Sequence, residues 1–224
     1  MCSAPLTALQ IYILFRLILN KHKKSFIFDD ECLMLKYMKH NIIRLDIVDS
    51  TNNEAKRRID SLADLSVIAA YDQTAGRGQG DHTWLSAPGM NLTFSIILKY
   101  GEGSKIHDVP AAGQAVIMGI ITDTILELLS VHGIDANVKW PNDIYVAGRK
   151  ICGILIEHAV RGRSLVHSII GVGLNVNQTM FDESLPDPTS MLLETDGGEL
   201  DPDLLLEELM DIFHKNIDNI TYNR

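Results

Sequence analysis

Short strand-like segments dominate the middle of this chain, and segments with helical character occur singly between them. The predicted strands cover residues 42–48, 66–71, 91–99, 137–140, 144–146, 151–158 and 165–174. The predicted helices cover residues 52–62, 110–131 and 200–217. Successive strands joined by turns favour antiparallel pairing, and single helices must bury their apolar sides on a sheet. The order therefore predicts an α+β fold, with a mainly antiparallel mixed sheet and helices packed on one face.

Two local signals place the helices. Residues 110–131 carry apolar side chains at helical spacing, which predicts a long core helix with one buried face. The buried face is expected to hold Ile117, Ile120, Ile121, Thr124 and Leu128. Earlier in the chain, residues 51–54 (Thr-Asn-Asn-Glu) have the form of a capping box, which marks the start of a helix.

The composition is that of an ordinary soluble domain and excludes some classes of function. The chain has 224 residues, 46% of them hydrophobic and 22% charged, which suits one large domain or one domain with a tail. A net charge of -9 argues against nucleic-acid binding. Cys2, Cys32 and Cys152 form no paired framework, which favours reduced thiols in the cytoplasm.

The first 38 residues are predicted to be an N-terminal extension, and residues 39–224 to be the folded domain. The apolar run 6–19 is short for a membrane span and is interrupted by Arg16. Basic residues follow this run, whereas a signal peptide has them in front. We therefore expect no membrane association. A later start at Met34 or Met38 and a short helical arm are alternatives for this segment.

A glycine-rich loop at residues 76–80 is the strongest local signal of a binding site. Alternate glycines let backbone N–H groups approach a ligand closely, and Arg77 between them offers a fixed positive charge. The loop is neither a Walker loop nor a dinucleotide fingerprint, because the spacing and the flanking elements differ from both. A flexible surface loop is the alternative interpretation.

Three further polar motifs follow or precede predicted strands. Residues 139–143 (Lys-Trp-Pro-Asn-Asp) place a cation, an aromatic ring and a carboxylate close together, although turn and core roles would explain them too. Residues 171–177 (Gly-Val-Gly-Leu-Asn-Val-Asn) end a strand, where a bulge is the simpler explanation. Residues 49–52 (Asp-Ser-Thr-Asn) coincide with the helix start, where capping and ligand binding can coexist.

The chain carries no sign of a structural metal site or of covalent catalysis. Its eight histidines include no H-x-x-x-H pair on a helix and no cluster with cysteine at zinc spacing. It also lacks the G-x-S-x-G motif and any clear nucleophile with an adjacent base. We therefore predict no protein-bound metal.

In this order, the motifs resemble those of bacterial biotin protein ligases. The family carries D-S-T-N, Q-x-x-G-R-G followed by a tryptophan, K-W-P-N-D, K-x-x-G-I-L-x-E and G-x-G-x-N-x-N. Here these motifs are residues 49–52, 73–84, 139–143, 150–157 and 171–177. The resemblance covers roughly residues 42–178 and is specific. It implies the catalytic core shared by biotin and lipoate ligases, in a monofunctional form without a DNA-binding domain and without the small C-terminal barrel.

The resemblance implies that biotin and ATP, with Mg²⁺, form biotinyl-5'-adenylate, and that biotin then passes to a lysine of a biotin carboxyl carrier protein. Lys139 and Arg77 are the implied catalytic residues. The implied biotin-binding residues are Ser50, Thr51, Asn52, Gln73, Arg77, Gly78, Gln79, Lys139 and Gly153. The implied ATP and adenylate contacts are Arg77, Trp84, Lys139, Asn142 and Asn175.

Elementary chemistry agrees with these roles. A carboxylate that attacks a phosphate brings two anions together, so cations must offset their repulsion by position and charge. Biotin's ureido ring is neutral and polar, which suits buried hydroxyl and amide partners. Gln79 and Gly80 depart from the family, in which a second arginine is common at position 79. Arg149 or Lys150 would then add the missing positive charge.

Two alternatives remain open from the sequence. A lipoate ligase shares the fold and the acyl-adenylate step, and a catalytically weak biotin-binding regulator would fit the less basic loop. The family also allows a homodimer through edge strands. Neither nucleic acid nor a membrane is an expected partner, and the expected location is the cytoplasm.

Overall fold

The computed structural model describes residues 40–107 and 109–222. The predicted N-terminal extension and the first two cysteines lie outside the described residues. Cys152 is a free thiol in the core, and its burial raises its pKa above the ordinary range.

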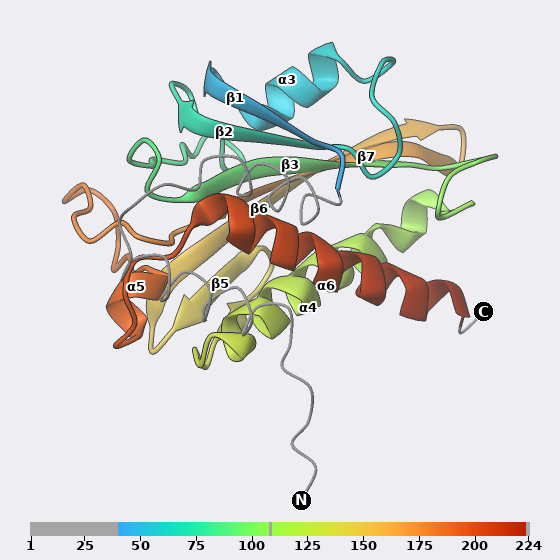
Figure 1. Ribbon diagram of the computed structural model, residues 1–224. Coiled ribbons are helices and arrows are strands. Elements are labelled where there is room, and N and C mark those ends of the chain that lie inside the picture. The colour runs from blue at the N-terminus through green and yellow to red at the C-terminus, as the bar shows by residue number, and fades with distance from the viewer. Residues whose placement is uncertain (1–39, 108, 223–224) are drawn as a thin grey trace, which may run out of the picture. The chain divides into compact units, whose positions relative to one another are not determined.

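Seven strands form one mixed sheet, in the order β1-β2-β3-β7-β6-β5-β4 (Figure 1). The strands are β1 (Ile42–Val48), β2 (Val67–Gln73), β3 (Leu92–Lys99), β4 (Asn137–Lys139), β5 (Asp143–Val146), β6 (Arg149–Arg161) and β7 (Ser164–Leu174). Among these strands, only β1 and β2 pair in parallel. Parallel neighbours need a long connection that returns to the starting edge, and the segment between β1 and β2, which contains a helix, provides it. The other pairs are antiparallel. The predicted class is confirmed.

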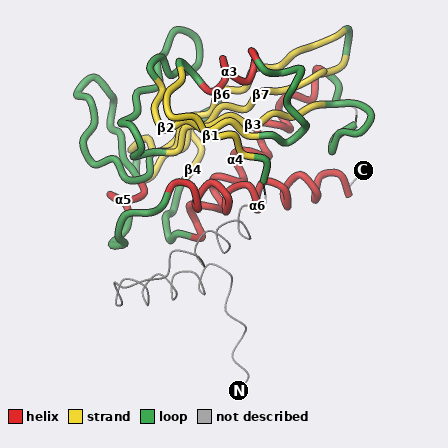
Figure 2. The backbone as a smooth tube through the Cα atoms, turned by 45° about the horizontal axis from the view of Figure 1, so that its top comes forward, coloured by secondary structure: helices red, strands yellow, loops and turns green. Residues whose placement is uncertain are grey.

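The two long helices cover one face of the sheet. They are α4 (Gln114–Val131), which follows a short 3-10 helix η1 (Ala111–Gly113), and α6 (Pro202–Tyr222). Figure 2 shows both helices on the same side of the strands. The five residues predicted for the inner face of α4 are all buried. Residues 111–131 are long and apolar enough to cross a membrane by length and composition, and in this fold their inner face packs in the core.

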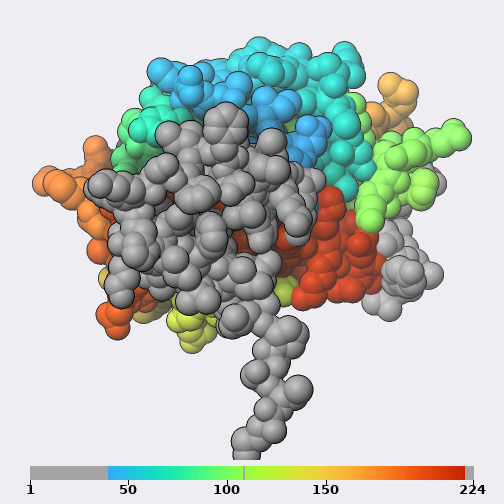
Figure 3. Space-filling view, viewed as in Figure 1, coloured from blue at the N-terminus to red at the C-terminus, as the bar shows by residue number. Residues whose placement is uncertain are grey.

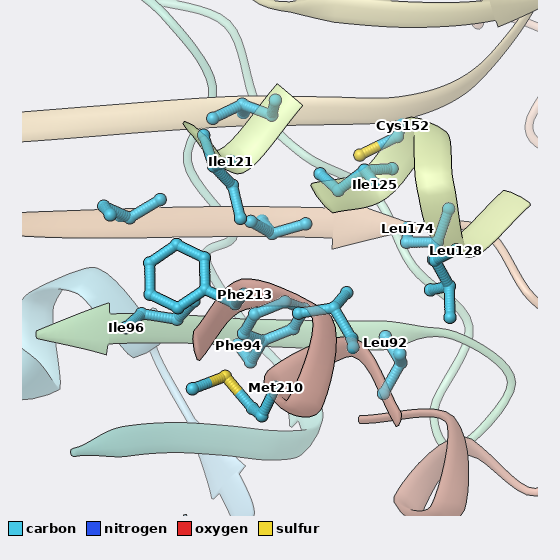
Figure 4. Packing of buried hydrophobic residues seen from close by; sticks show 14 of the residues in the cluster. Leu92, Phe94, Ile96, Ile121, Ile125, Leu128, Cys152, Leu174, Met210 and Phe213 are labelled. Carbon is cyan, nitrogen blue, oxygen red and sulfur yellow. The ribbon is translucent and has the colours of Figure 1, made fainter. Parts of the chain in front are cut away.

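The main core lies between this helical layer and the sheet. Phe94 on β3 and Phe213 on α6 are fully buried and lie close together in Figure 4, where Ile125 of α4 lies next to Cys152 of β6. Arg44 of β1 donates a hydrogen bond of 2.7 Å to Asp203 of α6. In the space-filling view both elements reach the same face of the molecule (Figure 3).

The short helix α3 (Thr51–Arg57) packs on the opposite face, against β2, β3 and β7. A second, smaller cluster fills this contact and contains Ala55, Leu62, Ile68, Ile97 and Ile169. Because α3 covers only part of this face, the strands beside it are left for polar residues. The predicted placement of helices on one face therefore describes α4 and α6, while α3 lies on the other.

The capping box predicted at residues 51–54 is wrong. The N-cap is Ser50, in an extended conformation, and its side chain makes no capping hydrogen bond. The hydroxyl of Thr51 bonds other side chains of the domain, and Glu54 pairs with Arg57 and Arg58. The helix is also shorter than the predicted 52–62. A one-turn helix α5 (Met191–Glu194), capped by Ser190, was not predicted.

Candidate active site

A cavity of about 220 Å³ lies on the α3 side of the sheet, over β6 and β7. Ten of the predicted site residues line it: Ser50, Thr51, Asn52, Gln73, Arg77, Gly78, Gln79, Trp84, Asn142 and Gly153. His82, Thr83, Asp143, Lys150, Ile154, Leu155, Gly171, Val172 and Gly173 complete the lining. Segments more than 100 residues apart thus meet in one place.

One end of the cavity is a buried chain of neutral polar groups. Gln73 Oε1 accepts a hydrogen bond of 2.8 Å from the backbone N–H of Thr51, and it lies 3.2 Å from the Thr51 hydroxyl. Ser95 on β3 links the hydroxyl of Thr51, at 2.8 Å, to Oδ1 of Asn52, at 2.6 Å. Ser95 was missed from the sequence. The available signal was Thr93 and Ser95 at alternate positions of an apolar strand, which places both on one face.

The glycines of the cavity floor allow close approach of side chains to the strands. A Cβ at Gly171 would lie 2.4 Å from Asn52 Oδ1, and one at Gly173 would lie 2.2 Å from the Trp84 ring. A Cβ at Gly153 would also touch this ring, at 3.0 Å. Both Gly171 and Gly173 keep regular pairing with β3 and β6, so the strand is not bulged there.

Arg77 is held by protein groups at the edge of the cavity. Its guanidinium donates to Asn53 Oδ1 at 3.1 Å and forms an ion pair with Glu157 at 3.1 Å. Burial alone would raise the pKa of Glu157, but hydrogen bonds from Lys56, Asn52 and Arg77 lower it below its ordinary value. The positive charge of Arg77 is therefore already paired with an ionised carboxylate.

Lys150, rather than Lys139, reaches the cavity. The Lys139 side chain is exposed, its Nζ lies 3.3 Å from Tyr145 Oη, and it is not among the residues that line the cavity. Lys150 Nζ pairs with Asp143 Oδ1 at 2.8 Å and lies 5.8 Å from the centre of the Trp84 ring. The catalytic role of Lys139 stays a prediction without support from its position.

A β-bulge explains this placement of Lys150. In a regular strand, residues three apart such as Lys150 and Gly153 point to opposite faces. The register between β5 and β6 shifts between Ile144 and Tyr145, where two residues of β6 oppose one of β5. Lys150 and Gly153 therefore both line the cavity.

A second cavity of about 280 Å³ adjoins the first and shares five of its residues. The shared residues are His82, Thr83, Trp84, Asp143 and Lys150, and the remainder are Leu85, Tyr145, Asn175, Phe181, Leu185, Pro186 and Pro188. Asn175 donates to Thr189 O at 2.9 Å. Within the described part of the chain, its buried Oδ1 and the buried Nε1 of Trp84 have no hydrogen-bond partner. Both residues line the second cavity, while the two unpaired atoms are themselves buried.

Two asparagines of the sequence motifs, the predicted site residue Asn142 and the motif residue Asn177, bind backbone groups. Asn142 donates from its side chain to Ile154 O at 3.1 Å, which ties the segment before β5 to β6. Asn177 bonds the backbone of Leu200 in both directions, at 2.7 and 2.9 Å. In residues 40–107 and 109–222, no three His, Cys, Asp or Glu side chains are grouped so as to hold a metal ion.

Comparison with known proteins agrees with this geometry. The profile of the Biotin/lipoate A/B protein ligase family matches residues 44–175, more than half of the chain. The chain belongs to this family. The chain is similar to the biotin–[acetyl-CoA-carboxylase] ligase of Mycobacterium tuberculosis. The two are 36% identical over 174 residues, covering 71% of this chain and 58% of the relative.

Other ligase family members show the same likeness. The bifunctional ligase/repressor BirA of Escherichia coli is 31% identical over 166 residues, covering 74% of this chain and 50% of that protein. The chain spans about half the length of the bifunctional relatives that it matches. The structure of the biotin protein ligase from Aquifex aeolicus in complex with biotin and ATP superposes with a TM-score of 0.61 at 28% identity. That match covers 80% of this chain and 71% of the other.

Proposed function

We propose that this chain is the catalytic domain of a biotin protein ligase. It would activate biotin with ATP to biotinyl-5'-adenylate and transfer biotin to a lysine of a biotin carboxyl carrier protein. The observation that carries the proposal is the pairing of a cavity of neutral polar groups with an adjoining cavity, joined by Lys150 and Trp84. The names of the relatives and of the Aquifex aeolicus complex support the same ligands.

The two cavities suit the two substrates of this reaction. The chain of Thr51, Gln73 and Asn52 offers neutral hydrogen-bonding groups, as the ureido ring of biotin requires. The second cavity combines apolar side chains, such as Leu85, Phe181 and Leu185, with polar groups where it meets the first, which suits a nucleotide with a flat base. The biotin carboxylate and the α-phosphate would then meet at the junction.

Lys150 is the cation at this junction. Its ammonium is paired with Asp143, and both residues line both cavities. It would stabilise the negative charge that develops as the carboxylate attacks the α-phosphate, while the protein needs no covalent nucleophile. Arg77, which is bound to Asn53 and Glu157, would hold the glycine loop over the bound adenylate.

Magnesium fits this site as a partner of ATP. Mg²⁺ is commonly held by one or two carboxylates together with substrate phosphates. Among the described residues that line the two cavities, Asp143 is the carboxylate available for it. The ion would supply positive charge to the triphosphate.

We also propose that residues 39–224 form the catalytic domain and that it acts in the cytoplasm, in keeping with the free thiol of Cys152. A homodimer is compatible with the fold, because β5 covers β6 only as far as Gly153 and leaves the edge of residues 154–161 without a strand partner among the described residues. Nucleic acid and membrane are not proposed as partners.

The test is pyrophosphate release from Mg-ATP with biotin or lipoate as the second substrate, followed by mass spectrometry of the bound product. We expect biotinyl-adenylate with biotin and no response to lipoate. A response to lipoate alone would assign the chain to the lipoate branch of the family. Biotin binding without pyrophosphate release would instead support a regulator.

A further inference from the structure

The buried polar chain under the cavity has a fixed hydrogen-bond direction at both ends. At one end, Asn52 Nδ2 faces Glu157 Oε2 at 3.0 Å and Leu155 O at 3.3 Å, two atoms that only accept. Oδ1 of Asn52 must therefore face Ser95. At the other end, the backbone N–H of Thr51 only donates, so Gln73 must present Oε1 to it. Both ends of the chain are thus amide oxygens, which accept.

Two hydroxyl groups lie between these amide oxygens. The chain has three oxygen contacts: Asn52 to Ser95 at 2.6 Å, Ser95 to Thr51 at 2.8 Å, and Thr51 to Gln73 at 3.2 Å. Each hydroxyl has one proton, so two protons must serve three contacts. Ser95 is placed to donate either to Asn52 or to Thr51, and Thr51 is placed to donate to Gln73. If Ser95 gives its one proton to Asn52, over the shortest contact, the proton of Thr51 can serve Ser95 or Gln73. In each of these arrangements, both protons are used inside the protein.

This count decides what the cavity offers to a ligand. Thr51 lines the cavity but has only lone pairs left for a bound molecule. Gln73 lines it too, and its Nε2 makes no hydrogen bond within the described residues, so it offers N–H donors. A ligand that satisfies both must carry an N–H group next to a carbonyl, as amides and cyclic ureas do.

We propose that Ser95 is a positioning residue that fixes the Thr51 hydroxyl as an acceptor, so that the cavity selects a cyclic urea over a ring without the N–H group. Ser95 itself is fully buried and does not line the cavity. Glu157 supports it from the far side by holding Asn52 in the required orientation. The inference rests on the proposed function, because it takes biotin as the ligand.

The test compares the dissociation constant of biotin with those of its two cyclic carbamate analogues, in which one or the other ring N–H is replaced by oxygen. In the wild-type chain, an oxygen at the position that faces Thr51 meets only lone pairs. We expect that analogue to bind roughly 10- to 100-fold more weakly than biotin, the ratio for one buried group left without a partner. Calorimetric titration measures the dissociation constants of biotin and of each analogue.

Ser95→Ala removes the nearer partner of the Thr51 hydroxyl and leaves only the more distant Gln73 Oε1, at 3.2 Å. The proton of Thr51 can then turn into the cavity and donate to the ring oxygen. The relevant ratio is the dissociation constant of the analogue with oxygen facing Thr51 divided by that of biotin. We expect this ratio to shrink by about fivefold or more in the variant. Ser168→Ala is the matched control, because Ser168 is an equally buried serine of the same sheet that bonds Tyr100 and His158. In Ser168→Ala the ratio of the two dissociation constants should equal that of the wild type, even if the substitution changes the free energy of unfolding.

Ser95→Cys fills the site with a somewhat larger side chain that is a weaker donor, so it serves if the alanine variant does not fold. It should shift the ratio in the same direction. A ratio that stays at the wild-type value in both variants would overturn the role of Ser95 and leave the ligase function intact. A wild-type chain that fails to bind biotin would overturn the proposed function itself, together with the assigned ligand class.

Discussion

Lys139 on β4 and Lys150 on β6 are two lysines on either side of β5, and their surroundings differ. Lys150 pairs with Asp143 inside the site, whereas Lys139 lies exposed against the ring of Tyr145, with 4.6 Å between Nζ and the ring centre. Charge stabilisation acts over short distances in a sheltered site, so the lysine that lines the cavity should carry the chemistry.

Lys150→Ala should reduce the rate of biotin-dependent pyrophosphate release by about 100-fold or more, which is typical for loss of one transition-state contact. Lys139→Ala should keep the rate within about threefold of the wild type, because an exposed lysine contributes little. Stopped-time pyrophosphate assays measure both rates. The reverse order of the two effects would restore Lys139 as the catalytic lysine.

Gly173 is a residue at which a single methyl group should disturb the site. A Cβ there would lie 2.2 Å from the Trp84 ring, so Gly173→Ala should displace the ring and change the indole fluorescence. It should also speed the escape of bound adenylate. Gly119→Ala is the control, because nothing lies within 4 Å of its Cβ position. An unaltered spectrum in Gly173→Ala would argue that Trp84 does not pack on β7 in solution.

At the scale of elements, Glu157 joins helix α3, the glycine loop and β6. It accepts hydrogen bonds from Lys56 at 2.7 Å, Asn52 at 3.0 Å and Arg77 at 3.1 Å. These three partners come from segments about 100 and 80 residues away in sequence. One carboxylate therefore links three parts of the chain at the edge of the cavity.

The free energy of unfolding should reveal this carboxylate through its pH dependence. The pKa of Glu157 is lowered from 4.5 in the folded chain. Its ionised carboxylate therefore adds to the free energy of unfolding above pH 4.5. The contribution is lost as the pH falls below 4.5 through the folded pKa. Urea unfolding should therefore show the wild type more stable than Glu157→Gln at pH 7, with the difference shrinking in acid. A difference that grows in acid would contradict the ion-pair role.

At the scale of the whole molecule, one face of the sheet forms the main core and the other forms the candidate active site. The face under α4 and α6 holds the main core, and the face beside α3 holds the cavity. Substitutions on the core face should therefore change stability more than chemistry.

Ile121→Val is a test of this separation. Ile121 is fully buried between α4 and the sheet (Figure 4), and removing one methylene should lower the free energy of unfolding by about 0.5–1.5 kcal/mol. Denaturant titration measures the loss. The rate of pyrophosphate release per folded molecule should stay unchanged, and a parallel loss of rate would show that the two faces are coupled.

The sequence by itself determined most of the elements, their order and about half of the cavity lining. Strand alternation and helical spacing are local properties, and β1, β3 and α4 begin and end within a few residues of their predicted limits. The glycines and polar groups at strand ends also marked the cavity, because such residues are costly elsewhere in a strand.

Only the tertiary structure decided which side chains face one another. The bulge opposite Tyr145 directs Lys150 into the cavity. The spacing of residues within one strand does not predict such a register shift, because the shift depends on the partner strand. Likewise, the chain from Glu157 through Asn52 and Ser95 to Thr51 joins three segments that are distant in sequence. Side-chain direction on a strand depends on its pairing with neighbours, so such contacts exist only once the sheet is assembled.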